Sequence, residues 1–324
     1  MTPKIFKWKK AGHLYSVSGE SQLMASHAQV PVAELIDDER IRIYYSSRDS
    51  SNRSRIYSME ISSKPPYKVI LVNKDPILDL GPLGSFDDCG VMPTWVIDVG
   101  SHKYLYYIGW NTRKDIPYHN SIGLAISKDG GQSFTKAFAG PILDRNANEP
   151  YFAGTACVIN ENGVWKNWYL SCTGWAQGAR VPEPLYHLKY AESLDGINWS
   201  RKGIVAIDYK NPEEGGIVKA AVVHFEDGYS MWYAYRNKFD FRENTSNSYK
   251  IGYAQSEDGI HWSRMDEISG IENSKDGWDS QMTAYPHVIP VKNQLLMFYN
   301  GNGFGASGFG VAVAENKYRL YGAQ

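Results

Sequence analysis

Short runs of alternating apolar and polar residues recur along the whole chain, and no long helical stripe of apolar residues interrupts them. A period of two is typical of half-buried β-strands, whereas an amphipathic helix repeats about every 3.6 residues. The clearest runs are rich in tyrosine and tryptophan, and there are five of them: residues 41–48 (IRIYYSSR), 104–110 (YLYYIGW), 167–175 (NWYLSCTGW), 230–236 (SMWYAYR) and 295–303 (LLMFYNGNG). The pattern predicts an all-β protein.

A Ser-x-Asp-Gly turn followed by an aromatic residue separates several of these runs. It occurs as SKDGGQSF, SLDGINW and SEDGIHW, with Asp129, Asp195 and Asp258 spaced by 66 and 63 residues. Asp-Gly between two strand-like runs favours a hairpin, because aspartate accepts backbone hydrogen bonds and glycine tolerates positive φ. We therefore assign a structural role to the three aspartates, and we expect the aromatic residue after each turn to pack between neighbouring sheets.

The repeating unit contains three or four antiparallel strands in about 65 residues, so five units account for the 324 residues. Sheets of this kind close radially into a β-propeller, because each needs neighbours to bury both faces. The last unit has no Asp-Gly hairpin after residues 308–315, but the N-terminal FKWKKAG matches NWSRKG, with Trp8 over Trp199. We predict one five-bladed β-propeller domain over residues 1–324, with four-stranded blades and the N-terminal strand closing the last blade. The alternative of two unrelated β-sandwiches does not explain this match.

Acidic residues occupy one repeated position, six residues before an aligned point on the innermost strand of four units. These acids are Asp87, Glu149, Glu214 and Asp279, separated by 62, 65 and 65 residues. The first unit has Ala25 at this position. The innermost strands of a propeller face one axial funnel, so we expect at least two of these carboxylates to line a ligand pocket. The alternatives are capping of turn N–H groups or a register shifted to the nearby acids Asp88, Asp144 and Glu213.

Clustered carboxylates suit cleavage of a glycosidic bond, because one protonates the leaving oxygen while another acts as base or nucleophile. The same oxygens suit Ca²⁺ as a competing structural use, but the chain has no EF-hand loop. No cofactor is predicted. Residues expected to bind a carbohydrate around the same funnel are His27, Gln29, Arg48, Asp88, Trp110, Trp175, Arg236, Tyr285 and His287. Arginine suits a carboxylate or phosphate, and tryptophan faces stack on sugars; packing between blades is the alternative for both.

Charge and composition exclude several classes of protein. Lys plus Arg (34) and Asp plus Glu (35) nearly cancel, which argues against a nucleic-acid partner. Three widely spaced cysteines form neither a disulfide framework nor a zinc pattern. No apolar run reaches the roughly 18 residues of a membrane span, and residues 1–15 lack the apolar core of a signal peptide. These features predict a cytoplasmic protein with no membrane partner, and they carry no signal for its oligomeric state.

Five repeats, four of them with an acid before the inner strand, resemble the five-bladed propeller glycosidases, which include the invertase, arabinanase/xylosidase and mannoside-phosphorylase groups. The resemblance implies a base or nucleophile Asp in the first blade, a transition-state-stabilising Asp in the second and a general-acid Glu in the third. Asp87 in FDDCGVMP matches the second-blade acid and Glu149 in NEPYFAG the general acid. Ala25 departs from the pattern, so Asp279 or Glu214 would have to supply the missing base or nucleophile.

The resemblance implies a glycoside hydrolase that acts on a glycan or oligosaccharide by carboxylate acid/base chemistry in the axial funnel. The missing first-blade acid leaves two alternatives. One is a non-catalytic glycan-binding propeller. The other is a phosphorylase or transferase of polysaccharide metabolism, in which His27, Arg48 or Arg236 receives the phosphate.

Overall fold

The computed structural model describes residues 2–322, and this part of the chain consists of twenty β-strands, one 3-10 turn (Asp266–Ile268) and one helical turn, α1 (Asn302–Gly305). The all-β prediction is confirmed. Within these residues, neither helical turn has the length and apolar character needed to cross a membrane.

The N-terminal half forms a sheet of eight strands in the order β2-β3-β4-β6-β7-β8-β9, with β5 beside β4. Its strands are β2 (Ser26–Leu35), β3 (Arg40–Arg48), β4 (Ser54–Ser62), β5 (Val69–Val72), β6 (Gly90–Val99), β7 (His102–Asn111), β8 (His119–Ser127) and β9 (Thr135–Lys136). A single parallel pairing, Ser54 with Gly90, joins β4 to β6. The sheet therefore consists of two four-stranded antiparallel groups that touch at one edge.

The next part of the chain repeats this arrangement in the order β10-β11-β12-β14-β15-β16-β17, with β13 beside β12. Its strands are β10 (Ala153–Glu161), β11 (Val164–Gln177), β12 (Pro182–Ser193), β13 (Val205–Ile207), β14 (Glu214–Phe225), β15 (Gly228–Asn237), β16 (Lys250–Ser256) and β17 (Ser263–Arg264). Again one parallel pairing, Tyr186 with Gly216, links the two four-stranded groups.

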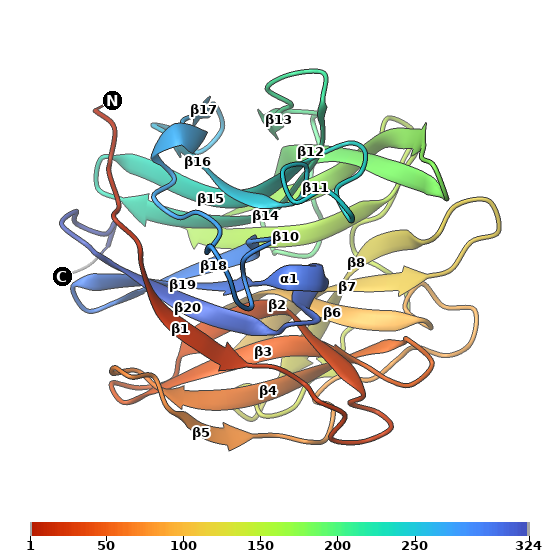
Figure 1. Ribbon diagram of the computed structural model, residues 1–324, viewed down its shortest axis with the longest axis horizontal. Helices are drawn as coiled ribbons and strands as arrows, with labels where there is room; N and C mark the ends of the chain where they lie inside the picture. Colours follow the sequence, from red (N-terminus) through yellow and green to blue (C-terminus); the bar gives the residue numbers. More distant parts are fainter. Residues whose placement is uncertain (1, 323–324) are drawn as a thin grey trace.

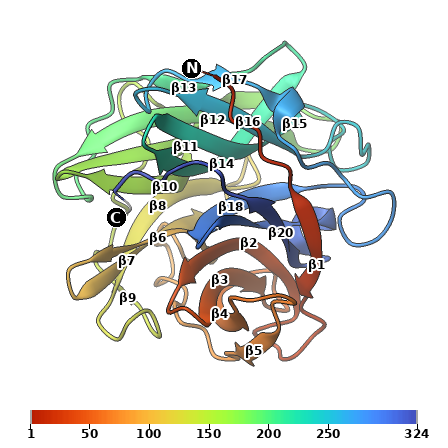
Figure 2. The same ribbon diagram turned by 90° about the vertical axis from the view of Figure 1, so that its left-hand side faces the viewer.

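The two ends of the chain share the last sheet, whose order is β1-β20-β19-β18. Its strands are β1 (Lys9–Tyr15), β18 (Ala284–Val291), β19 (Gln294–Asn300) and β20 (Phe309–Glu315). Figures 1 and 2 show the red N-terminal strand along the blue C-terminal hairpin. In this pairing, Lys9 of β1 lies opposite Val313 of β20. The expected role of the N-terminal strand in completing the last four-stranded group is confirmed.

The first strands of the five groups contact one another in a ring. Strand β2 contacts β6, β6 contacts β10, β10 contacts β14, β14 contacts β18, and β18 returns to β2. The hydrophobic core fills the spaces between successive groups. Its largest fully buried side chains include Trp168, Trp232, Tyr44, Tyr106 and Tyr107, so much of the aromatic excess of the sequence serves to pack the groups against each other.

The Asp-Gly turns have the structural role expected of them. Asp195 Oδ1 accepts hydrogen bonds from the backbone N–H groups of Ile197 and Asn198, both at 2.8 Å. The backbone hydrogen bond from Asn198 is the main cause that lowers the pKa of this carboxyl. The aromatic residue after each turn packs on the preceding group, in the pairs Phe134–Tyr44, Trp199–Tyr106 and Trp262–Trp168. Trp8 of the N-terminal segment packs on Trp232 in the same way.

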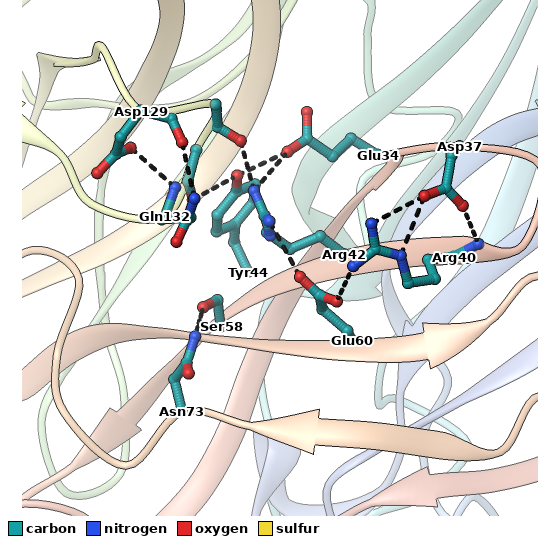
Figure 3. A network of polar contacts seen from close by, with 12 residues as sticks. Glu34, Asp37, Arg40, Arg42, Tyr44, Ser58, Glu60, Asn73, Asp129 and Gln132 are labelled. Carbon is teal, nitrogen blue, oxygen red and sulfur yellow. Dashed lines mark hydrogen bonds and ion pairs between the residues drawn. The ribbon is translucent and has the colours of Figure 1, made fainter.

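A polar network ties the first group to the turn of the second (Figure 3). Arg42 donates to the Gly130 carbonyl at 2.5 Å and to Glu60 at 3.0 Å, and the Tyr44 hydroxyl donates to Glu34 at 2.7 Å. Buried arginine in this network is therefore balanced by carboxylates.

Candidate functional site

Asp87 and Asp279, two of the acids predicted to be catalytic, form ion pairs inside their own sheets. Asp87 Oδ2 lies 2.6 Å from Lys136 Nζ and accepts a hydrogen bond from the Tyr107 hydroxyl at 3.1 Å. Asp279 Oδ2 lies 2.6 Å from Lys10 Nζ and accepts from the Tyr299 hydroxyl at 2.9 Å. Both aspartates are buried.

Glu149 and Glu214 are held in the same way. Glu149 lies 3.4 Å from Arg201 and 3.4 Å from Lys189, and it accepts a hydrogen bond from the Tyr169 hydroxyl at 2.9 Å. The Glu214 carboxylate accepts hydrogen bonds from both terminal nitrogens of Arg264, at 2.7 and 3.0 Å. Each acid thus ties the start of a group's first strand to a cation from the outer part of the same group.

The cations that partner the acids follow a repeat of their own. Each stands two residues after the aromatic residue of the hairpin, in the pairs Phe134–Lys136, Trp199–Arg201, Trp262–Arg264 and Trp8–Lys10. Three of the acids also bond a tyrosine 20 positions later in the chain. This repeat was visible in the sequence and indicates a structural ion pair in four of the five groups.

A cavity of about 550 Å³ opens where the first strands converge. Every four-stranded group contributes a first-strand residue to its wall: His27, Met92, Gly154, Val218 and Tyr285. Gln29, Arg48, Trp110 and Arg236 also line it, so six of the residues expected to bind a ligand are brought together.

None of the four acids lines this cavity, and neither does Asp88, Trp175 or His287. The expectation that at least two of the carboxylates face this cavity is therefore not met, because their side chains turn into the sheets. Asp88 accepts a hydrogen bond from the Gly84 N–H at 2.8 Å, so its carboxylate caps a backbone turn. His287 is buried and bonds to the Ala33 carbonyl at 2.9 Å. Trp175 packs behind the wall, against Tyr118 and Phe152.

The alternative acids do not replace these four. Asp144 bonds His119 at 2.9 Å, and Glu213 lies exposed on the surface. No aspartate or glutamate belongs to the cavity wall within residues 2–322. In that same range, no group of three or more His, Cys, Asp or Glu residues is arranged to hold a metal ion.

Arg48 and His27 form one side of the cavity. Arg48, at the end of β3, donates its Nε to Gln29 at 2.9 Å and one terminal nitrogen, Nη1, to Asn52 at 2.8 Å. Burial, followed by the neighbouring Arg48 guanidinium, lowers the pKa of His27 to about 4. His27 is therefore neutral at pH 7.

Arg236, unlike the half-buried Arg48, has a fully enclosed guanidinium group that stacks on aromatic rings. Its central carbon lies 3.7 Å from the centre of the Phe241 ring, and its side chain is buried. It donates to the carbonyls of Pro184 and Asn237 at 2.9 and 2.8 Å and to the hydroxyls of Tyr186 and Tyr249. These bonds fix its position.

Several cavity residues lie outside the repeat, so aligning the repeats along the sequence could not locate them. Phe241 and Arg242 come from the loop between β15 and β16, and Phe304 comes from α1, where its φ of 59° requires an unusual backbone. The glycine-rich segment GNGFGASGFG accommodates this turn. Tyr118, Tyr186 and Tyr249 complete the aromatic wall.

Two mycobacterial proteins resemble this chain along almost its full length. The uncharacterized proteins Rv1502 and MT1551 of Mycobacterium tuberculosis, strains H37Rv and CDC 1551, are each 36% identical over 309 residues, which cover 95% of this chain and 99% of theirs. The chain belongs to the family of these proteins. No protein-family model matches it.

Solved structures share the fold of this family at low sequence identity. A glycosyl hydrolase from Bacteroides ovatus superposes with a TM-score of 0.72 at 16% identity, over 100% of this chain and 98% of its own. A structure from the GH130 family of mannoside phosphorylases, which contains glycoside hydrolases targeting β-1,2 mannosidic linkages in Candida mannan, gives 0.72 at 15% identity, over 99% and 97%. This chain thus has the fold of glycoside hydrolases and mannoside phosphorylases.

Proposed function

We propose that this chain is a carbohydrate-active enzyme built as a single five-bladed β-propeller domain over residues 1–324, with its glycan or oligosaccharide ligand in the cavity at the axis. The ring of contacts among the five first strands supports the propeller. The shared fold with glycosidases and phosphorylases supports the ligand class.

The observation that carries the proposal is the composition of the cavity wall. Its volume of about 550 Å³ falls within the range of small-molecule sites. Trp110 offers an indole face, held by a hydrogen bond from its Nε1 to Ser54 at 2.9 Å. Polar side chains such as Gln29, Asn120 and Thr155 stand among the aromatic residues, as a site that recognises hydroxyl-rich rings requires.

The cavity wall argues against ordinary two-carboxylate hydrolysis at this place. That chemistry needs two carboxyl groups roughly 5–9.5 Å apart across the scissile bond, and the described wall has no acid. Transfer of a glycosyl unit to phosphate remains within the proposal, because a protonated phosphate can form the new bond to the anomeric carbon and pass its own proton to the departing glycosidic oxygen. The catalytic roles of Asp87, Glu149, Glu214 and Asp279 stay a prediction, and their ion pairs favour a structural role.

A second candidate function is non-catalytic glycan binding. The same observation, a cavity wall without a carboxylate, favours it directly. A binding protein needs the aromatic and polar wall but no acid/base pair.

A paired screen separates the two. The full chain is assayed against p-nitrophenyl glycosides and oligosaccharides, with and without inorganic phosphate, and in parallel on a glycan array. Phosphate-dependent turnover supports the enzyme, and array binding without turnover supports the binding protein. Trp110→Ala is expected to abolish either signal, whereas Leu83→Ala, at a fully exposed position, leaves it unchanged. The absence of both turnover and array binding contradicts the proposal.

A further inference from the structure

We propose that the ligand of the cavity carries an anionic group, and that this group binds at Arg48 in the positive field of the enclosed Arg236. The inference rests on the proposed function, because it names the class of sugar that the cavity accepts.

The charge balance of the cavity wall is the first observation. Four arginines line it, and two of them are neutralised by the protein: Arg53 by Asp49 at 3.0 Å and Arg242 by Glu183 at 3.1 Å. Arg48 and Arg236 take part in none of the ion pairs formed within residues 2–322. With no acid on the wall, the cavity is left with two uncompensated positive charges.

Other buried or half-buried arginines of the fold pair with carboxylates, whereas the buried Arg236 and the half-buried Arg48 do not. Arg42 pairs with Glu60 at 3.0 Å, Arg55 with Asp79 at 2.7 Å and Arg264 with Glu214 at 2.7 Å. Arg236 is only 1% exposed, and an unpaired buried charge is destabilising. Both exceptions face the cavity, where a ligand anion would supply the missing negative charge.

A third uncompensated cation lies directly behind the wall. Lys219 is fully buried and contacts no carboxylate in the described part of the chain; its ammonium group lies 3.5 Å from His287 Nδ1 and 5.4 Å from the centre of the Trp95 ring. Its backbone N–H bonds to Thr155, which belongs to the cavity wall. This charge adds to the positive potential at the cavity wall.

The two arginines have different tasks. The donors of Arg236 are satisfied by carbonyls and phenol hydroxyls, so it acts through its field and does not need to touch the ligand. Arg48 donates hydrogen bonds from Nε to Gln29 and from Nη1 to Asn52, whereas its Nη2 donates to no residue between 2 and 322. Arg48 is therefore the group that would donate a charge-assisted hydrogen bond to the ligand.

The ligand class that fits is a sugar that bears a phosphate or a carboxylate, with its ring against Trp110. Both anions accept guanidinium hydrogen bonds. A neutral glycan would leave the two charges unbalanced.

Calorimetric titration of the full chain tests this with four probes: glucose, glucose 1-phosphate, glucuronate and inorganic phosphate. We expect the anionic sugars to bind about tenfold or more tightly than glucose, as one charge-assisted hydrogen bond predicts, and to weaken as salt increases. Whichever of the two anionic sugars binds more tightly shows whether the site prefers a phosphate or a carboxylate. Arg48→Gln should remove this preference without lowering the melting temperature of the free protein. Arg40→Gln, which deletes a paired surface charge away from the cavity, is the matched control.

Equal affinity for glucose and the anionic sugars, or an unchanged preference in Arg48→Gln, overturns the inference and leaves the proposed function standing. Binding of inorganic phosphate that requires Arg48, with no sugar bound more tightly than phosphate, supports the anion site but contradicts the carbohydrate function. If no anion binds at all, the inference is wrong.

Discussion

The Nζ atom of Lys10 lies 2.6 Å from Oδ2 of Asp279, although the two residues are 269 positions apart in the chain. Lys10 belongs to β1 and Asp279 precedes β18, so this ion pair fastens the N-terminal strand onto the last group. Equivalent pairs inside three other groups join residues only 49 to 52 positions apart, whereas this one joins the N-terminal strand to the last group.

Loss of the Lys10 ammonium is expected to destabilise the protein. Lys10→Met leaves the Asp279 carboxylate buried without its cation, and because the Lys10 side chain is 27% exposed, we expect a loss of about 2–3 kcal/mol, below the full range for a broken buried pair. Urea denaturation measures it. Lys9→Met, at the exposed neighbouring position, should change the free energy of unfolding by less than about 0.5 kcal/mol.

Glu149→Gln distinguishes a structural acid from a catalytic one. The amide keeps the shape but removes the negative charge that faces Arg201 and Lys189, so we expect about 1–3 kcal/mol of lost stability. Ligand affinity in the cavity should stay the same, because Glu149 is not part of the wall. Full stability combined with loss of turnover would instead establish the general-acid role that the glycosidase resemblance implies. Glu192→Gln, at a more exposed pair with Lys202, is the control.

The stability of the protein should depend on pH through Lys219. Burial lowers the pKa of this amine from 10.5 to about 8, so between these values the unfolded chain holds the proton and the folded chain does not. The free energy of unfolding contributed by Lys219 therefore rises with pH across this window, by roughly 3 kcal/mol for a shift of this size. Lys219→Met should lose this rise and be more stable than the wild type at pH 7. Denaturation at several pH values, with exposed Lys250→Met as reference, measures the difference; parallel curves for wild type and Lys219→Met would contradict it.

Gly90 sets the position of the Trp110 indole. A Cβ atom at this position would lie 1.9 Å from Trp110 Nε1 and 2.3 Å from Ser54 Oγ, so Gly90→Ala should break their hydrogen bond and move the ring. We expect weaker carbohydrate binding and a stability loss of about 1–3 kcal/mol. Titration and tryptophan fluorescence measure the two effects. Gly140→Ala, where the added atom meets nothing within 4 Å, should be silent, and an unperturbed Gly90→Ala would show that Trp110 is not held there.

The sequence predicted the strand arrangement well because the repeat is local. Asp129, Asp195 and Asp258 identified the hairpins, and the match of Trp8 to Trp199 identified the strand that the N-terminus supplies. Both signals lie in short stretches of sequence, because a few adjacent residues determine a turn and the alternation of side chains along a strand.

The site was harder to predict, because a repeated position along the chain does not say which way a side chain points. Asp87 and its three equivalents share a position, but a cation and, in three of the groups, a tyrosine within the same sheet draw the carboxylate away from the axis. The cations stood two residues after each hairpin aromatic, so this outcome could have been inferred. Phe241, Arg242 and Phe304 lie in segments outside the repeat, and no register could have located them.

A crystal structure of the full chain soaked with its tightest-binding sugar tests the central claim most directly. We expect density for a sugar ring in the cavity against Trp110, with the anionic group within hydrogen-bond distance of Arg48 Nη2. A ligand bound elsewhere, or one held by Asp87, Glu149, Glu214 or Asp279 after their ion pairs have opened, would contradict it.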